Sequence, residues 1–104
     1  MTSFDNREAA FENRFAHDAE LRFRVAARRN RLLGDWAARH LGLGGDAADA
    51  YAKSIVAADL EEAGDEDVIR KLVADLAPAG IDDAAIRAQL AEQAQVARQQ
   101  IESE

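Results

Sequence analysis

The chain of 104 residues has no cysteine, a single proline, and one residue each of tryptophan, tyrosine and threonine. The absence of cysteine excludes disulfide bonds, thiolate catalysis and zinc sites with cysteine ligands. No apolar run approaches the roughly 18 residues that indicate a membrane helix. The N-terminal residues MTSFDNRE carry charges and no signal-peptide apolar stretch. We therefore expect a soluble intracellular protein with no direct membrane insertion.

Positive charge is scarce overall but concentrated in one zone. The formal net charge is −7, from 13 Lys and Arg against 20 Asp and Glu. Residues 1–20 sum to −3, residues 21–40 to +5 and residues 41–104 to −9. An acidic surface repels a phosphate backbone, so the composition argues against DNA or RNA as a partner.

Helix-forming residues dominate what is present. Of the 50 hydrophobic residues 24 are alanines, so the larger apolar side chains suffice for one modest core. Glycines interrupt the pattern at 42–45, 64 and 80, and each break is followed by an aspartate that can cap a helix, namely Asp46, Asp65 and Asp82. These breaks predict helices over about 5–41, 47–63, 66–77 and 83–102.

Apolar residues recur at helical spacing within each predicted helix. The residues expected in the core are Val25, Ala26, Leu32, Leu33, Trp36, Tyr51, Ile55, Val56, Leu60, Ile69, Leu72, Val73, Leu76, Ile86, Leu90, Ala94, Ala97 and Ile101. Ile81 before the Asp82 cap and Ile86 after it have the spacing of a hydrophobic staple. Short connections favour antiparallel neighbours, and the fold class we predict is all-α, a small four-helix bundle.

The first twenty residues differ from the helix that follows them. At about 100° per residue, Phe4, Phe11 and Phe15 form one narrow seam, which continues through Asp18 and Arg22. Charges in a seam are unusual for a core helix. We therefore predict an amphipathic N-terminal helical arm over residues 1–20, mobile or loosely docked in the free protein, and a bundle domain over residues 21–104. The alternative is that the three phenylalanines fill the bundle core.

Catalytic and metal-binding patterns are missing. His17 and His40 are far apart, and neither has a second ligand at metal-site spacing. The acidic run at 61–67 lacks the twelve-residue loop of an EF-hand, and the glycines at 42–45 lack the Gly-Lys-Ser/Thr of a phosphate loop. We expect no enzyme, no catalytic residues and no metal site.

Arginines crowd the stretch from Arg22 to Arg31. Arg24, Arg28 and Arg31 lie roughly opposite the seam and could hold a nucleotide phosphate or an acidic protein. The alternative interpretation is that they form salt bridges to the acidic helices that follow.

Several motifs resemble one known family. The matching stretches are Phe4-Asp5-x-Arg7-Glu8-x-Ala10-Phe11-Glu12-x-Arg14-Phe15-Ala16-His17-Asp18, Ala27-Arg28-Arg29-Asn30-Arg31-Leu32-Leu33-Gly34-x-Trp36-Ala37-Ala38, Ala50-Tyr51-Ala52-Lys53 and residues 61–68. They are similar to the zeta subunit, the ATPase inhibitor of alphaproteobacterial rotary ATP synthases. The resemblance extends to about residue 76, and the last helix matches in length and polarity only.

The resemblance implies an inhibitor of ATP hydrolysis whose N-terminal helix inserts at a catalytic alpha/beta interface and blocks rotation. The implied partners are the alpha, beta and gamma subunits of the ATP synthase head, which would place the protein in the cytoplasm, peripheral to the inner membrane. The implied partner-binding residues are Phe4, Arg7, Glu8, Phe11, Glu12, Arg14 and Phe15. No cofactor is required, although weak ADP or ATP binding is an expectation from the family. The alternative function is a small helical binding module that holds a nucleotide or acidic protein through Arg22–Arg31 without inhibiting.

Overall fold

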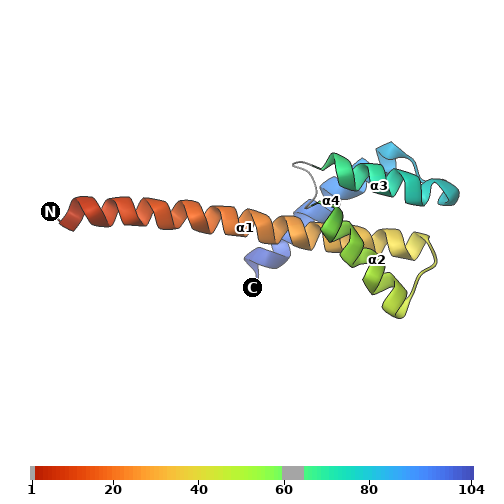
Figure 1. The fold of residues 1–104 in the computed structure, drawn as a ribbon, viewed down its shortest axis with the longest axis horizontal. Coiled ribbons are helices and arrows are strands. Elements are labelled where there is room, and N and C mark those ends of the chain that lie inside the picture. The colour runs from red at the N-terminus through yellow and green to blue at the C-terminus, as the bar shows by residue number, and fades with distance from the viewer. Residues whose placement is uncertain (1, 60–64) are drawn as a thin grey trace.

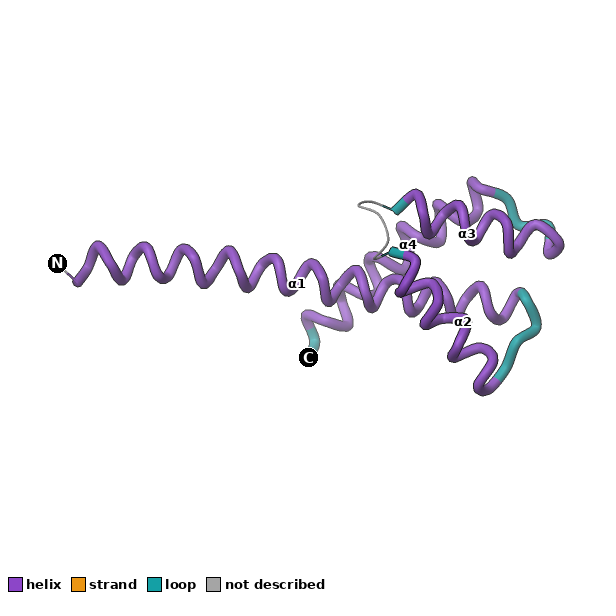
Figure 2. The backbone as a smooth tube through the Cα atoms, in the orientation of Figure 1, coloured by secondary structure: helices purple, strands orange, loops and turns teal. Residues whose placement is uncertain are grey.

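A computed structural model describes the backbone of residues 2–59 and 65–104, and the side chains of residues 18–59 and 65–104. Within these residues the chain forms four α-helices, α1 (Thr2–His40), α2 (Gly45–Ala58), α3 (Glu66–Leu76) and α4 (Asp83–Glu102), and a 3₁₀ turn, η1 (Ala77–Ala79). The described residues contain helices and loops and no strand (Figure 2). The predicted all-α bundle is therefore confirmed for this part of the chain.

The molecule is elongated because α1 is much longer than the other helices. Its 39 residues correspond to a rod of about 58 Å at the usual rise per residue. The extents of the molecule are 64 × 25 × 20 Å. Figure 1 shows the N-terminal part of α1 extending past the other three helices, while the C-terminus lies part-way along α1.

Local signals explain where the helices begin and end. After α1, Gly42 adopts a positive φ of 74°, and the N–H of Leu43 donates to the carbonyl oxygen of Ala38 at 2.9 Å. This arrangement satisfies a carbonyl group that the last turn of a helix leaves free. At the start of α4, the Asp82 carboxylate accepts a hydrogen bond from the N–H of Ala85 at 2.9 Å. The predicted bounds of α4, 83–102, and its Asp82 cap are confirmed.

Two of the predicted caps need correction. Helix α2 begins at Gly45 with Gly44 as its N-cap, so Asp46 lies inside the first turn and does not cap the helix. Its negative charge there still complements the helix dipole. The predicted end of this helix at residue 63 is also wrong, because α2 ends at Ala58 with Asp59 as the C-cap. Asp65 is the N-cap residue of α3, but its side chain makes no capping hydrogen bond.

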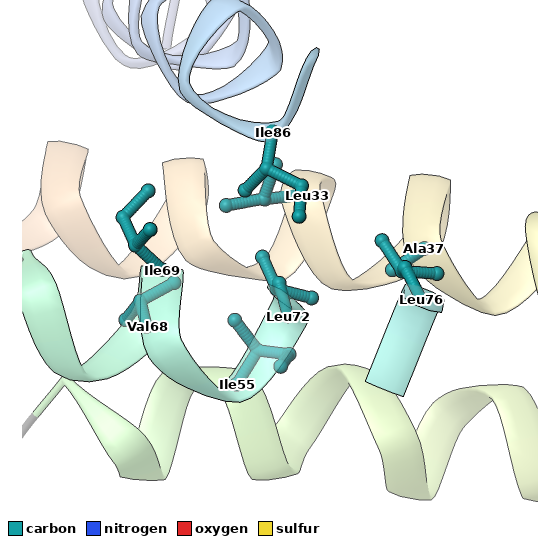
Figure 3. Close-up of a cluster of buried hydrophobic side chains, with 8 residues drawn as sticks. All are labelled: Leu33, Ala37, Ile55, Val68, Ile69, Leu72, Leu76 and Ile86. Atoms are coloured by element: carbon teal, nitrogen blue, oxygen red, sulfur yellow. The ribbon is translucent and has the colours of Figure 1, made fainter. Parts of the chain in front are cut away.

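The hydrophobic core lies where α2, α3 and α4 meet the C-terminal half of α1. Figure 3 shows its members, which are Leu33, Ala37, Ile55, Val68, Ile69, Leu72, Leu76 and Ile86. Trp36, Leu41, Tyr51, Val73, Ile81 and Leu90 are partly buried and pack against it. Both residues of the predicted staple, Ile81 and Ile86, therefore belong to or border the core.

The predicted core is confirmed in its centre and wrong at one end. Of the predicted core residues, those that are only partly buried and lie outside the central cluster are Val25, Ala26, Leu32, Val56 and Ala94. Ala97 and Ile101 are buried but not part of that cluster, and Leu60 lies outside the described residues. Helix α1 packs most extensively against α2 and α4, whereas α3 packs mainly against α4 and α2. The apolar residues of α1 before residue 30 thus lie at the edge of the bundle, where clefts open beside the helix.

Candidate partner-binding site

The predicted partner-binding residues all belong to the N-terminal part of α1. Its backbone places positions 4, 7, 8, 11, 12, 14 and 15 on one uninterrupted helix. The side chains of Phe4, Arg7, Glu8, Phe11, Glu12, Arg14 and Phe15 lie outside the described residues, as does that of His17. The structure therefore supplies the helical frame of the arm, and the seam is an argument from the sequence.

Two of the predicted phosphate-binding arginines are paired with the last residue of the chain. Arg24 and Arg28 each contact a different carboxylate oxygen of Glu104 at 2.6 Å, and Arg28 also donates to the side-chain oxygen of Gln100 at 2.9 Å. The hydrogen bond from Arg28 is the main reason that the pKa of Glu104 falls below its ordinary value, and the charge of Arg24 adds to it. These contacts join α1 to the end of α4 at the point where α1 leaves the bundle.

Arg31, the third of these arginines, is paired with α2. Its guanidinium contacts Asp49 at 2.5 Å and, one turn along α1, Asp35 at 3.5 Å. The hydrogen bond to Asp49 raises the pKa of Arg31, and the same bond together with Lys53 lowers the pKa of Asp49. The salt bridges to acidic residues that the sequence offered as an alternative are therefore present at all three arginines.

Arg29 connects α1 to both sides of the segment between α2 and α3. It contacts Asp65 at 2.9 Å and Asp59 at 3.7 Å, and it donates two hydrogen bonds to the Oδ1 atom of Asn30 at 2.9 and 3.0 Å. Its side chain is only 13% exposed. At about 100° per residue, Arg29 falls on the same side of α1 as Phe4, Phe11 and Phe15. Its guanidinium satisfies Asn30 there, which is itself 1% exposed.

A cleft of about 390 Å³ adjoins the three paired arginines. It is lined by Phe23, Arg24, Ala27, Arg28, Arg31, Val56 and Ile101. Phe23 is 61% exposed and is the exposed large hydrophobic residue of the described part of the chain. We call this site the Phe23 cleft. It combines an aromatic face and an apolar floor with guanidinium groups at its edge.

A second cleft, of about 300 Å³, separates α1 from α4 on another side of α1. Leu21, Val25 and Ile101 contribute its apolar lining, and arginines from both helices stand at its edge. We call it the α1–α4 cleft. The two clefts flank the same stretch of α1, directly after the projecting part of the helix.

Signs of catalytic or metal chemistry are not found in the described residues. No group of His, Asp and Glu side chains there could hold a metal ion. His40 is exposed and lies edge-on to the ring of Trp36, with 5.0 Å between the ring centroids. In the acidic run, the carboxylates of Asp65, Glu66 and Asp67 pair with arginines. No helix of the described chain is long and apolar enough to cross a membrane.

Comparison with known proteins decides the family. The sequence profile described as ATPase inhibitor subunit zeta matches residues 1–100. The chain belongs to this family. A related protein whose structure was determined by solution NMR is 44% identical, with a TM-score of 0.73, and the match covers 80% of this chain and 96% of that one. A search of curated proteins finds no match.

Family membership sets the general function. A zeta-type ATPase inhibitor regulates ATP hydrolysis and is not itself an enzyme, and its family implies that it binds the ATP synthase. The resemblance to the zeta family that was stated from the sequence motifs is thereby confirmed. The residues of this chain that contact the ATP synthase are inferred from the geometry of α1 at the point where it leaves the bundle.

Two residues close to the point where α1 leaves the bundle were missed by reasoning from sequence. Phe23 lies between two arginines and outside the seam, and an aromatic residue in such a position is a signal for an exposed anchor. Asn30 was cited only for its motif, and its burial depends on the helices that surround it. Neither property can be obtained from the periodicity of α1 alone.

Proposed function

We propose that this zeta-family chain inhibits ATP hydrolysis by inserting its arm, residues 1–20, at a catalytic alpha/beta interface of the rotary ATP synthase, beside the gamma subunit, and so blocks rotation. One observation carries the proposal: α1 is a single helix from Thr2 to His40 whose N-terminal part extends beyond the bundle (Figure 1). A preformed helix with no other helix along its side can enter a groove of another protein.

The seam supplies the anchors for such a groove. Phe4, Phe11 and Phe15 share one side of an ideal helix, and aromatic side chains in a central pocket carry much of the energy of an interface. Arg7, Glu8, Glu12 and Arg14 lie beside the seam and would set the register through charge pairs. These roles come from the sequence positions on a helix whose backbone the structure describes.

The bundle anchors the C-terminal end of the arm. The ion pairs of Arg24, Arg28 and Arg31 tie α1 to α4 and α2 directly behind the arm. A force that the rotor exerts on the inserted helix would therefore be carried by the whole bundle. Bound in this way, the protein would be cytoplasmic and peripheral to the inner membrane through the ATP synthase.

Hydrolysis of ATP by a matching synthase head tests the proposal. Full-length protein should inhibit, and protein lacking residues 1–19 should not. The triple variant F4A/F11A/F15A should inhibit with an apparent affinity reduced by about 100-fold or more, since truncating an interface anchor typically costs about 2 kcal/mol. The control N6A/N13A changes the opposite side of the helix and should inhibit normally. Equal inhibition by the triple variant and the control would falsify the insertion mechanism.

A second candidate function is nucleotide binding at the Phe23 cleft. The observation that favours it is the lining itself: Arg24, Arg28 and Arg31, the three predicted phosphate ligands, meet the exposed ring of Phe23 around one cleft. A base could stack on the ring while guanidinium groups hold the phosphates. The phosphates would have to compete with Glu104 and Asp49 for these arginines, which fits weak binding.

Titration with ADP, followed by backbone amide chemical shifts, tests this candidate. The largest shifts should fall on residues of the Phe23 cleft, and both F23S and R24Q/R28Q should weaken binding at least tenfold. The control R39Q alters an exposed arginine at the far end of α1 and should bind normally. Binding without any inhibition of hydrolysis by the wild type would favour a binding module; shifts located elsewhere would reject the cleft.

A further inference from the structure

The α1–α4 cleft has an apolar floor and two exposed arginines at its edge. It is lined by Leu21 and Val25 of α1 and Ile101 of α4, together with Arg22 of α1 and Arg98 of α4. The first three residues are buried or partly buried, whereas both arginines are exposed. A site that is apolar at its centre and charged at its edge is typical of a protein interface.

The charges of this cleft are not balanced within the protein. Over residues 18–59 and 65–104, Arg22 and Arg98 take part in no ion pair, in contrast to Arg24 and Arg28 of α1, which both pair with Glu104. The third arginine of the lining, Arg29, is already paired with Asp65 and Asp59, so Arg22 and Arg98 stand against one acid of the lining, Glu102. In a chain of net charge −7 this is a local excess of positive charge with guanidinium groups available to a carboxylate.

The cleft also continues the seam of the arm. Counting about 100° per residue, positions 4, 11, 15, 22 and 29 of α1 fall within an arc of about 40°. Arg22 and Arg29 line the α1–α4 cleft, and Arg22 follows Phe15 by about 10 Å along the helix axis. A protein that grips the phenylalanine seam and extends two turns further along α1 therefore reaches the cleft.

We propose that the α1–α4 cleft is a second contact with the target of the arm, and that it receives an acidic amphipathic segment of that protein. One or two carboxylates of the segment pair with Arg22 and Arg98, and an apolar side chain enters between Leu21, Val25 and Ile101. This inference rests on the proposed function, because the arm brings the segment to the cleft.

The chemistry selects this occupant over the alternatives. A small inorganic anion would use the guanidinium groups and leave the apolar floor exposed. An apolar partner would cover the floor and leave Arg22 and Arg98 without carboxylates. A segment with both properties satisfies both parts of the lining. A second copy of the chain is the remaining alternative, and the experiment distinguishes it.

The test compares the full-length double variant R22Q/R98Q with the matched control R39Q/R70Q. Glutamine is compatible with a helix and all four sites are exposed, so both variants should fold, as checked by circular dichroism. Binding to the synthase head and inhibition of its ATP hydrolysis are measured at low and moderate salt. We expect R22Q/R98Q to lose at least tenfold in affinity, mainly through slower association, with a weaker dependence on salt. The control should stay within twofold of the wild type.

Each outcome bears on the inference separately from the proposed function. Wild-type protein that neither binds nor inhibits overturns the proposed function, and the inference falls with it. Wild-type inhibition with equal inhibition by R22Q/R98Q overturns the inference alone. Sedimentation velocity of the free wild type and R22Q/R98Q detects a dimer that depends on these arginines, which would assign the cleft to a second copy and also overturn the inference. The variant L21D places a carboxylate beside the apolar floor of the cleft, and it should bind the synthase head more weakly than the wild type does.

Discussion

Gly34 of α1 lies directly against Ala52 of α2, so closely that a Cβ atom on Gly34 would come within 2.6 Å of the Ala52 Cα atom and 3.2 Å of its carbonyl oxygen. Both residues are buried. The atoms in the way belong to the backbone of α2, which cannot move without shifting the whole helix. The crossing of α1 and α2 therefore depends on the absence of a side chain at residue 34.

Gly34→Ala should destabilise the protein even though alanine is the better helix former. Overpacking a helix contact costs about 1–3 kcal/mol, which outweighs the roughly 1 kcal/mol that alanine gains over glycine within a helix. The melting temperature should fall by several degrees in thermal denaturation. Gly44→Ser is the control, because a Cβ there meets no atom within 4 Å and serine suits an N-cap; it should be neutral or stabilising.

Arg29→Met should destabilise the bundle by about 2 kcal/mol, since it leaves the Oδ1 atom of the buried Asn30 without its donor and removes the contact to Asp65. Urea unfolding measures the change. Arg22→Met is the matched control, because Arg22 is exposed and takes part in no ion pair within the described residues. Equal stability of the two variants would contradict the role we assign to Arg29.

The N-cap of α4 tests whether a single capping residue contributes to stability at the start of a helix. Asp82→Ala should lower the stability by about 1 kcal/mol, because the carboxylate accepts the hydrogen bond of the Ala85 N–H. Asp46→Ala should cost a few tenths of a kcal/mol, since Asp46 lies in the first turn of α2 and only its interaction with the helix dipole is lost. Chemical denaturation of both variants in parallel makes the comparison.

The pairing of Glu104 should make stability depend on pH in the acidic range. Its pKa in the folded protein lies below the ordinary value of 4.5 because Arg28 and Arg24 favour the carboxylate. The stabilisation is therefore complete above the pKa of the unfolded chain and is lost as the pH falls through the lower pKa of the folded one. An NMR titration should show the pKa of Glu104 rising in R24Q/R28Q, while that of Glu66, which pairs with Arg87, stays below its ordinary value.

Amide exchange should separate the arm from the bundle. A helix with no neighbour is held by its own hydrogen bonds only, and these open readily in water. The amides of residues 4–15 should therefore exchange faster than those of residues 86–97 in α4, as measured by hydrogen exchange in the free protein. Slower exchange over residues 4–15 would contradict a free arm, and binding to the synthase head should slow it.

The parts of the fold that depend on neighbouring residues could be predicted from the sequence. Asp82 and the Pro78–Gly80 break define the start of α4 because a cap and a left-handed glycine act within one turn. The predicted start of α2 was wrong because either Gly44 or Asp46 could serve as the N-cap residue. The positive φ of Gly45 directs the chain so that Gly44 takes that position. The spacing of residues along the sequence does not decide which of the two residues caps the helix.

The candidate site was predicted in its residue types and less well in its arrangement. The arginines between 22 and 31 were identified, but their partners come from residues 18 to 80 positions away, such as Asp49 and Glu104. Those pairs exist only because α2 and α4 pack against α1. The exposure of Phe23 depends in the same way on where α4 ends relative to α1.

The sequence by itself determined the helical class, the start of α4 and the family, because helix propensity, capping residues and motifs are properties of short stretches. The tertiary structure decided which face of α1 is buried, that the close approach at Gly34 sets the crossing with α2, and which arginines are paired. It also decided that the local excess of positive charge within an acidic chain lies beside an apolar cleft at the root of the arm. Packing among distant helices controls these features, since it brings each side chain its partner or leaves it exposed.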